Sequence, residues 1–172
     1  MNEAKVVKQS VITQAELKET LHYDPLTGIF TWAKKTGKSV IIGNRAGYLK
    51  SNGYITIQLN GIAYFAHRLA WLYVTGIMPI KFIDHKDGNP SNNWFDNLRE
   101  STPLQNMQNM RKPSKNNKTG FLGVSFSKQR LKFEAVIAVK GKRKSIGFFT
   151  TPELASAAYI AEKRKLHEFC TI

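Results

Sequence analysis

Two short stretches rich in apolar residues lie close together in the first half of the chain. These stretches, residues 55–59 and 62–66, lie on either side of Asn60-Gly61. Short apolar runs around an Asn-Gly pair predict a β-hairpin with a type I′ turn. A further apolar run at 29–32 predicts another strand. The first half of the chain is therefore expected to be β-rich.

Helical signals flank these strands. Thr13 and Glu16 have the spacing of a capping box, which predicts a short helix over about 14–22. From His67 the apolar residues recur at helical spacing until Gly76, where a second helix is expected to end. The helices in this region are therefore expected to be short.

Residues 83–109 predict a ββα arrangement. A strand ends in Asp84-His85, a loop rich in Gly, Asn and Pro follows, and a second short strand carries Asn97. A helix is expected to start at Pro103, with Thr102 as its N-cap. This layout concentrates polar side chains at the end of a strand and on the first turns of a helix.

The polar residues of this region suit metal-dependent hydrolysis. The layout can bring Asp84 next to Asn106, so that one carboxylate oxygen and one amide oxygen face a shared point. A small set of oxygen ligands that leaves room for phosphate and water is typical of magnesium. His85 points to the opposite side of the strand, where a neutral imidazole can take a proton from water, and Asn97 can accept the other ring N–H.

Charge narrows the class of partner. The chain has 172 residues, with 26 Lys and Arg against 12 Asp and Glu, and a formal net charge of +14. This excess predicts a polyanionic partner, with nucleic acid first and an anionic membrane surface second. The single cysteine, Cys170, excludes an internal disulfide and a zinc knuckle. Without a long apolar stretch or a signal-peptide core, the protein is expected to be cytoplasmic.

The C-terminal third is the more basic part and has its own pattern. Residues 113–172 hold 12 basic and 4 acidic residues. After a polar linker at 113–118 come three predicted strands and a helix over about 152–167. Seven bases and one acid lie within 128–144. A three-stranded sheet with a helix on one face leaves the other face free to enter a major groove.

Four short motifs resemble the HNH (ββα-metal) endonuclease motif, in the variant of phage HNH homing endonucleases. They are His67-Arg68-Leu69, the Asp84–Asn89 loop, Asn97-Leu98-Arg99 and Gln105-Asn106. The resemblance implies hydrolysis of DNA phosphodiester bonds with one divalent ion, Mg²⁺ or Mn²⁺, without structural zinc. It also implies a phage-encoded protein that acts in the cytoplasm of a bacterial host cell.

The same resemblance implies roles for individual residues. Asp84 and Asn106 would be metal ligands, His85 the general base, and Asn97 the residue that orients His85. Arg99 would pair either with the scissile phosphate or with Asp96. The HNH core is expected over 63–112, after an N-terminal helix and β-rich region at 1–62.

The C-terminal pattern resembles the APETALA2-type DNA-binding domain. The match extends over about 119–169 and rests on four segments, at 120–125, 132–135, 146–149 and 157–159. It implies a domain at 119–172 whose sheet faces DNA. The implied DNA-facing residues are Ser125, Lys128, Arg130, Lys132, Lys142, Arg143 and Ser145. The whole chain is thus expected to be α+β: a β-rich N-terminal region, a ββα-metal core, and a small antiparallel sheet with a helix.

Other interpretations stay open. Many HNH relatives have a basic or small polar residue in the place of Trp94, so an alternative is a DNA-binding regulatory protein whose nuclease site is impaired, with Trp94 responsible. An RNA-binding module is a third possibility, although aromatic stacking motifs of the RRM type are missing. His67 is expected to be structural rather than a phosphate contact. Double-stranded DNA is the expected partner, with no membrane and no small-molecule cofactor.

The position of the basic residues predicts a division of labour. A chain ending near Arg111 is expected to keep the chemistry, since Asp84, His85, Asn97 and Asn106 all precede that residue. It is expected to bind DNA more weakly and with a shallower salt dependence, because most of the excess charge follows it.

Overall fold

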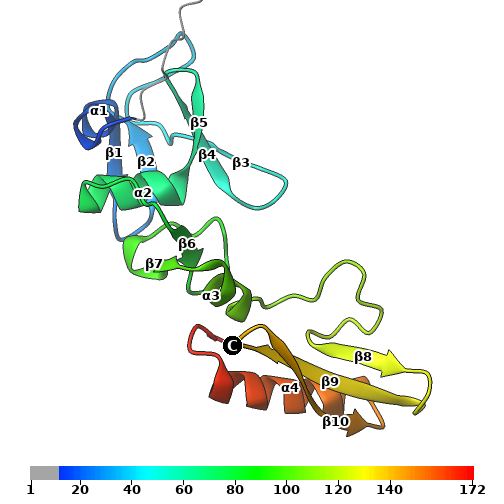
Figure 1. Ribbon diagram of the computed structural model, residues 1–172. Coiled ribbons are helices and arrows are strands. Elements are labelled where there is room, and N and C mark those ends of the chain that lie inside the picture. The colour runs from blue at the N-terminus through cyan, green and yellow to red at the C-terminus, as the bar shows by residue number, and fades with distance from the viewer. Residues whose placement is uncertain (1–11) are drawn as a thin grey trace, which may run out of the picture. The chain divides into compact units, whose positions relative to one another are not determined.

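Residues 12–172 are described by the computed structural model, and their first elements begin where local sequence signals place them (Figure 1). Helix α1 spans Gln14–Thr20, and both halves of the capping box form between Thr13 and Glu16. Strand β1 (Leu21–Asp24) follows at once and pairs antiparallel with β2 (Ile29–Trp32). The predicted strand at 29–32 is therefore confirmed, and the predicted helix forms but ends at Thr20, because Leu21 and His22 belong to β1.

The predicted hairpin forms with the predicted turn. Strand β4 (Ile55–Leu59) pairs antiparallel with β5 (Ile62–Phe65), and β3 (Tyr48–Leu49) adds a third strand on the other edge of β4. Asn60 and Gly61 both have positive φ, 50° and 80°, as a type I′ turn requires. Helix α2 (Ala66–Thr75) begins directly after β5 and ends at the left-handed Gly76.

The ββα arrangement is present in the structure, with one difference from the prediction. Strand β6 (Phe82–His85) pairs with β7 (Leu98–Ser101), and helix α3 (Pro103–Gln108) follows with the Thr102 capping box. The prediction that a strand carries Asn97 is wrong. Asn97 ends the 3₁₀ helix η1 (Phe95–Asn97), because its N–H bonds the carbonyl of Trp94 in a tight turn before the strand begins.

The C-terminal module is the predicted three-stranded antiparallel sheet with a helix. Strands β8 (Val124–Ser127), β9 (Lys132–Val139) and β10 (Lys142–Phe149) lie in the order β10-β9-β8. Helix α4 (Pro152–Leu166) packs against all three strands.

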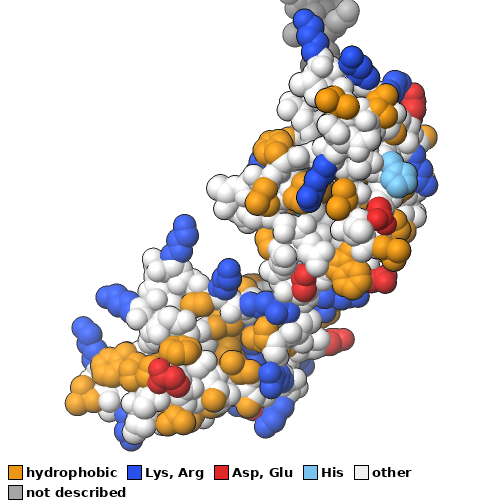
Figure 2. Space-filling model, turned by 180° about the vertical axis from the view of Figure 1, so that it is seen from behind, with side chains coloured by type: hydrophobic (Ala, Val, Ile, Leu, Met, Phe, Trp, Pro, Cys, Tyr) orange, Lys and Arg blue, Asp and Glu red, His pale blue; other side chains and the backbone are white. Residues whose placement is uncertain are grey.

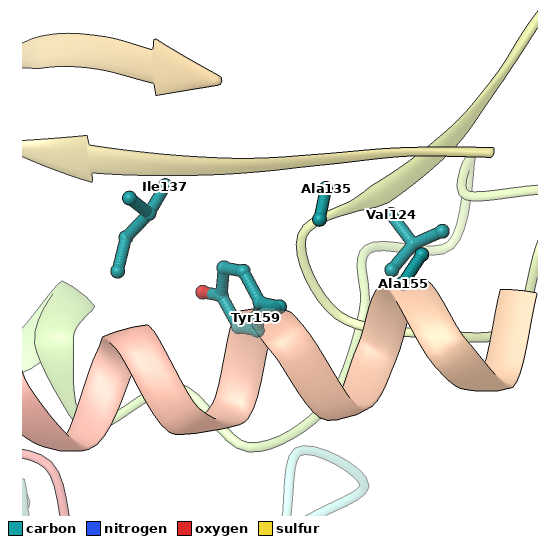
Figure 3. Packing of buried hydrophobic residues seen from close by; sticks show 5 residues of the cluster. All are labelled: Val124, Ala135, Ile137, Ala155 and Tyr159. Atoms are coloured by element: carbon teal, nitrogen blue, oxygen red, sulfur yellow. The ribbon is translucent and has the colours of Figure 1, made fainter. Parts of the chain in front are cut away.

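The core of this module is apolar and tightly closed. Figure 3 shows side chains of the sheet facing those of α4, with Ala155 and Tyr159 on the helix. Gly123 makes this approach possible, since a Cβ there would lie 2.1 Å from a ring carbon of Tyr159. The buried residues of the cluster are Val124, Ala135, Ile137, Ala155 and Tyr159.

The chain alternates between two compact units. The first contains the described chain up to Ile80 together with Pro90–Leu98, and the second contains Lys81–Asn89 and Arg99–Ile172. The predicted linker at 113–118 lies within the second unit and forms no helix or strand. Asn117 orders its end, because the side chain bonds the carbonyls of Phe121 and Val124. Independent folding of residues 119–172 stays a prediction.

The architecture as a whole is α+β, built from several small sheets and short helices. Among residues 12–172 no helix is both long and apolar enough to cross a membrane.

Candidate nuclease site

The carboxylate of Asp84 is the centre of the candidate site. It lies in β6, is 6% exposed, and is surrounded by hydrogen-bond donors. Arg99 Nε and Nη2 donate to Asp84 Oδ2 at 3.0 and 2.9 Å. Asn109 Nδ2 lies 3.2 Å from Oδ1 and 3.1 Å from Oδ2. The buried charge is thus paired and hydrogen-bonded, as burial of a carboxylate demands.

The two oxygens of this carboxylate are used unequally. Oδ2 accepts from both Arg99 nitrogens and from Asn109, whereas among the described residues, 12–172, Oδ1 has only the longer contact with Asn109. Since a carboxylate offers about four acceptor sites, Oδ1 keeps capacity for a cation. Within residues 12–172 no group of three or more His, Cys, Asp and Glu side chains is placed to hold a metal. The amide group that lies against Asp84 is the Nδ2 donor of Asn109, so the carboxylate is the one oxygen ligand that the described residues place here, and the metal stays a prediction.

The structure distinguishes the two asparagines of α3 and its C-terminus. Asn109 is buried against Asp84, and its Nδ2 also donates to the backbone oxygen of His85 at 2.7 Å. Asn106, the predicted ligand, is exposed, and its N–H bonds Thr102 O within the first turn of α3. None of the side-chain hydrogen bonds that the structure gives for residues 12–172 joins Asn106 to Asp84. Two acceptor oxygens that share a metal ion need no hydrogen bond to each other, so the ligand role of Asn106 stays a prediction.

Sequence reasoning missed Asn109. It lies three residues after Asn106, so the two share one face of a helix and the same sequence signal. Only burial separates them, and burial depends on where the helix ends. Asn109 is the C-cap of α3, where the chain turns back toward β6.

His85 and Asn97 are both buried, at 4% and 2% exposed. His85 follows Asp84 in β6, so successive side chains point to opposite faces of the strand. Asn97 Nδ2 donates to Asn92 O at 2.8 Å, and its Oδ1 is the kind of acceptor atom that the predicted role requires. The orienting role of Asn97 and the general-base role of His85 stay predictions.

Arg99 pairs with a third partner, which neither of the two predicted alternatives named. Its guanidinium pairs with Asp84 rather than with Asp96, and in this structure without nucleic acid no phosphate is present to compare. Nη2 also donates to the carbonyl of Phe169 at 2.8 Å, and the guanidinium carbon lies 4.0 Å from the centre of the Phe169 ring. A DNA contact by Arg99 stays a prediction.

The two aromatic residues named near the site have structural surroundings. His67 is buried at the start of α2, where its ring lies 5.3 Å from that of Tyr54 and 5.4 Å from that of Phe65. Trp94 is 38% exposed and precedes η1. A Cβ on Gly28 would lie 2.2 Å from Trp94 N, so the turn after β1 lies directly on this backbone. The structural expectation for His67 fits these contacts.

Lys163 links α4 to the chain that follows α3. Its side chain is 1% exposed, and Nζ donates to the carbonyl of Met110. Burial lowers the pKa of this ammonium below the ordinary 10.5 of lysine; nearby Cys170 opposes the shift, and Arg111 adds to it. The C-terminal module is therefore held to the ββα region by a buried polar contact.

The sheet of the C-terminal module exposes basic side chains. Figure 2 shows Lys and Arg side chains distributed over this part of the molecule. Residues directly opposite each other in antiparallel strands share a face. Arg143 and Ser145 lie opposite Ala138 and Val136, on the face away from α4, and Lys142 lies opposite Val139, on the α4 side.

The other predicted DNA-facing residues divide in the same way. Ser125 lies opposite Glu134, and Lys132 is two residues before it in β9, so both belong to the outer face. Lys128 and Arg130 are exposed in the β8–β9 turn, where Arg130 lies 4.4 Å from the centre of the Phe148 ring. The outer face is not wholly basic, since Glu134 accepts a hydrogen bond from Ser145 at 2.7 Å.

Comparison with known proteins defines the class. Residues 64–108, which include Asp84, His85, Asn97 and Asn106, match a family model described as HNH endonuclease. Protein 3.8 of Escherichia phage T7 is 35% identical over 102 residues, which make up 59% of this chain and 83% of the phage protein. The chain belongs to the same family as this phage protein and carries an HNH endonuclease domain.

A solved structure also resembles the chain. Its title is "DNA binding and cleavage by the HNH homing endonuclease I-HmuI", and it is 26% identical, covering 79% of this chain and 75% of that one, with a TM-score of 0.42. The predicted HNH resemblance is confirmed by the family match over 64–108. The APETALA2-type resemblance of the C-terminal module stays a prediction.

Proposed function

We propose that this protein is a DNA endonuclease that hydrolyses phosphodiester bonds with one divalent ion, Mg²⁺ or Mn²⁺. The observation that carries the proposal is the buried Asp84 carboxylate, next to His85 within the HNH domain, whose Oδ1 accepts a side-chain hydrogen bond from Asn109 and has further acceptor capacity. A carboxylate this buried is expected to have a specific purpose, because burial of a charge is costly.

Each residue has a defined part in the proposed chemistry. Asp84 and Asn106 would hold the ion, which when bound polarises the phosphate and stabilises the charge that develops on it. His85 takes the proton of the attacking water at a ring nitrogen, and Asn97 is assigned the orienting role that the HNH resemblance implies. Arg99 stays on Asp84 Oδ2 and offsets the negative charge of the carboxylate.

The basic sheet of the C-terminal module is proposed to bind double-stranded DNA. All seven bases of 128–144 are exposed, which suits contact with phosphates. A hollow on the outer face is lined by Ser125, Val136, Ala138 and Arg143, among others, so polar and apolar groups are available for contacts within a groove. The homing type and the APETALA2-type identity are part of the proposal and rest on the sequence resemblance.

Plasmid cleavage tests the proposal. Supercoiled plasmid is incubated with the wild type in Mg²⁺, in Mn²⁺ and in EDTA, beside Asp84→Ala and Glu100→Ala. Glu100 is the matched control, because its carboxylate pairs with the exposed Lys81 on the same hairpin.

The wild type and Glu100→Ala are expected to give relaxed or linear DNA only with metal, and Asp84→Ala none. A wild type that shifts DNA mobility without product would support the DNA-binding regulatory alternative instead. Cleavage by Asp84→Ala at the wild-type rate would remove Asp84 from the site.

A further inference from the structure

Three side chains, in the ββα region or just after it, contact both the C-terminal end of β6 and the same short C-terminal segment, Phe169–Thr171. They are Arg99, Asn109 and Arg111, and all belong to the second unit. The C-terminus, labelled in Figure 1, thereby contacts the part of the molecule that holds Asp84, although 85 residues separate Lys86 from Thr171. These shared contacts suggest that the segment helps to arrange the candidate site.

Arg99 is fixed from two sides. Nη2 donates both to Asp84 Oδ2 at 2.9 Å and to Phe169 O at 2.8 Å, and the guanidinium lies over the Phe169 ring. An arginine side chain has many rotamers, and stacking on an aromatic ring with a second hydrogen bond restricts them. Phe169 therefore holds the guanidinium where it occupies Oδ2 and leaves Oδ1 open.

Asn109 is fixed in the same manner. Its Nδ2 faces three acceptors, the two Asp84 oxygens and His85 O, while its Oδ1 accepts a hydrogen bond from Thr171 Oγ1 at 2.6 Å. The two ends of an amide differ only in hydrogen bonding, so the donor at Oδ1 selects this orientation over the flipped one. In the flipped orientation Oδ1 would face the Asp84 carboxylate, an unfavourable contact.

Thr171 also contacts the residue after β6 directly. Its hydroxyl has one proton, shared between Asn109 Oδ1 and Lys86 O, and it accepts from Arg111 Nη2 at 2.6 Å. Arg111 Nη2 donates to Lys86 O at 3.2 Å and to Thr171 O at 3.0 Å. The Thr171 hydroxyl is thus the point at which the contacts of Asn109, Arg111 and Lys86 meet.

We infer that Phe169–Thr171 is a positioning segment of the nuclease site, which holds Arg99 and Asn109, and through them the carboxylate of Asp84, in the arrangement that receives the metal ion. The inference rests on the proposed function and adds a region that the HNH motif does not contain. It also revises the expectation that a chain ending near Arg111 keeps the chemistry.

Charge separates this role from DNA binding. Residues 168–172 contain no lysine or arginine, so a substitution there removes no basic side chain from the protein. A variant in this segment is therefore expected to alter the chemical step or metal affinity while DNA affinity stays the same. Loss of a residue that orients a metal ligand typically costs about 10- to 100-fold in metal affinity or activity.

The test compares Thr171→Val with Thr171→Ser. Valine keeps the shape and removes the hydroxyl, whereas serine keeps the hydroxyl. Thr75→Val is the matched control, an exposed threonine of the first unit whose hydroxyl also bonds a backbone carbonyl. Four quantities are measured on each full-length protein: single-turnover cleavage rate, DNA Kd, melting temperature, and Mn²⁺ affinity from the EPR signal of free Mn²⁺.

Thr171→Val is expected to lose about 10- to 100-fold in cleavage rate or Mn²⁺ affinity, with DNA Kd within about twofold of wild type. Thr171→Ser and Thr75→Val are expected to match the wild type. Phe169→Leu, which removes the ring but keeps the carbonyl, is the second variant and is expected to lose less than Thr171→Val.

Two results would overturn the inference while the proposed function stands. One is a wild type that cleaves and a Thr171→Val variant with unchanged rate and Mn²⁺ affinity. The other is an equal loss in Thr171→Ser, which would assign the effect to packing rather than to the hydroxyl. A wild type that neither cleaves nor binds Mn²⁺ would overturn the proposed function, and this inference with it.

Discussion

The second unit buries two kinds of residues in two places. In the C-terminal module the buried side chains are mainly apolar, with Ile137 and Tyr159 at the centre (Figure 3). In the ββα region the second unit buries Asp84, His85, Ser101 and Asn109. The first arrangement is stabilised by removal of apolar area from water, which has no preferred direction. The second depends on directional hydrogen bonds, each of which needs its partner in place.

The two buried regions should respond differently to substitution. An apolar core tolerates exchange among side chains of similar volume, since packing is its main requirement. A polar core loses more when one partner is removed, because the remaining group is left buried and unsatisfied. The candidate nuclease site is built in the second way. Removal of a single hydrogen-bonding atom should therefore affect the candidate nuclease site, whereas the stability of the C-terminal module should depend on the volume of its buried side chains.

The largest effect is expected from Asn106→Ala. If Asn106 holds the ion, cleavage falls below detection, while the melting temperature and DNA Kd stay close to wild type, because the side chain is exposed. Plasmid cleavage, a thermal melt and a mobility shift measure the three. A cleavage rate near wild type would transfer the ligand role away from Asn106 and make its buried neighbour Asn109 the residue to examine.

His85→Ala is expected to slow cleavage by about 10²- to 10⁴-fold, the range for loss of a general base. Asn97→Ala should cost less, since it removes an orienting group and not the base. Single-turnover rates at saturating Mg²⁺ compare the two, with Mn²⁺ affinity as a check that the ion still binds. A larger loss in Asn97→Ala, in a folded protein, would reverse the two roles.

Ile137→Ala tests the apolar core. The side chain is 1% exposed, so its truncation should lower the free energy of unfolding by about 2–5 kcal/mol. Ser101→Ala is the contrasting change in the polar region: within residues 12–172 the buried Ser101 Oγ is the exception that has no hydrogen-bond partner, so its removal should not lower the free energy of unfolding. Urea unfolding gives the free energy of unfolding of both variants. It thereby compares the loss of buried volume in the C-terminal module with the loss of a polar atom in the ββα region.

Replacing Lys128, Arg130, Lys132 and Arg143 by glutamine is expected to flatten the salt dependence of DNA binding. At roughly 0.9 per phosphate contact, four contacts reduce the slope of log affinity against log salt by about 3–4. Lys18, Lys34, Lys35 and Lys38, replaced together, give the same change of charge in the first unit. Equal slopes for the two variants would show that net charge, and not the C-terminal sheet, anchors the DNA.

The smallest effect is expected at Lys163. Burial lowers its pKa in the folded protein below 10.5, so just under that pH the unfolded chain binds more protons. The free energy of unfolding should therefore gain from this group as pH rises toward 10.5, by up to about 1.4 kcal/mol per unit of pKa shift. Urea unfolding at about pH 7.5 and about pH 10 should show a smaller gain in Lys163→Met. An equal gain in both proteins would assign the effect to other groups.

Local signals predicted much of the fold. The Thr13 capping box, the Thr102 N-cap and the Asn60-Gly61 turn all formed as predicted, because each depends on residues within three or four positions of one another. The 3₁₀ turn at Asn97 was missed because Asn97 directly precedes strand β7, and the sequence does not show at which residue the strand begins. The predicted site residues Asp84, His85 and Asn97 are all buried.

The rest of the site could not be predicted, because its contacts join distant residues. The Asn109–Thr171 hydrogen bond spans 62 positions and the Arg99–Phe169 hydrogen bond spans 70. Neither Phe169 nor Thr171 belongs to a motif, and a threonine near the end of a helix carries no signal of its own. Asn109 had the same sequence signal as Asn106, and only the end of α3 distinguishes them.

The alternation of the chain between its two units also governs the order in which a growing chain can fold. Strand β1 and the turn after it form hydrogen bonds with residues 93–95. The Tyr23 hydroxyl donates to Asn93 O, and Phe95 N–H donates to Pro25 O. A chain emerging from the ribosome has already released Lys81–Asn89, part of the second unit, before Pro90–Leu98 can complete the first. Synthesis that stalls within Pro90–Leu98 would therefore leave both units unfinished.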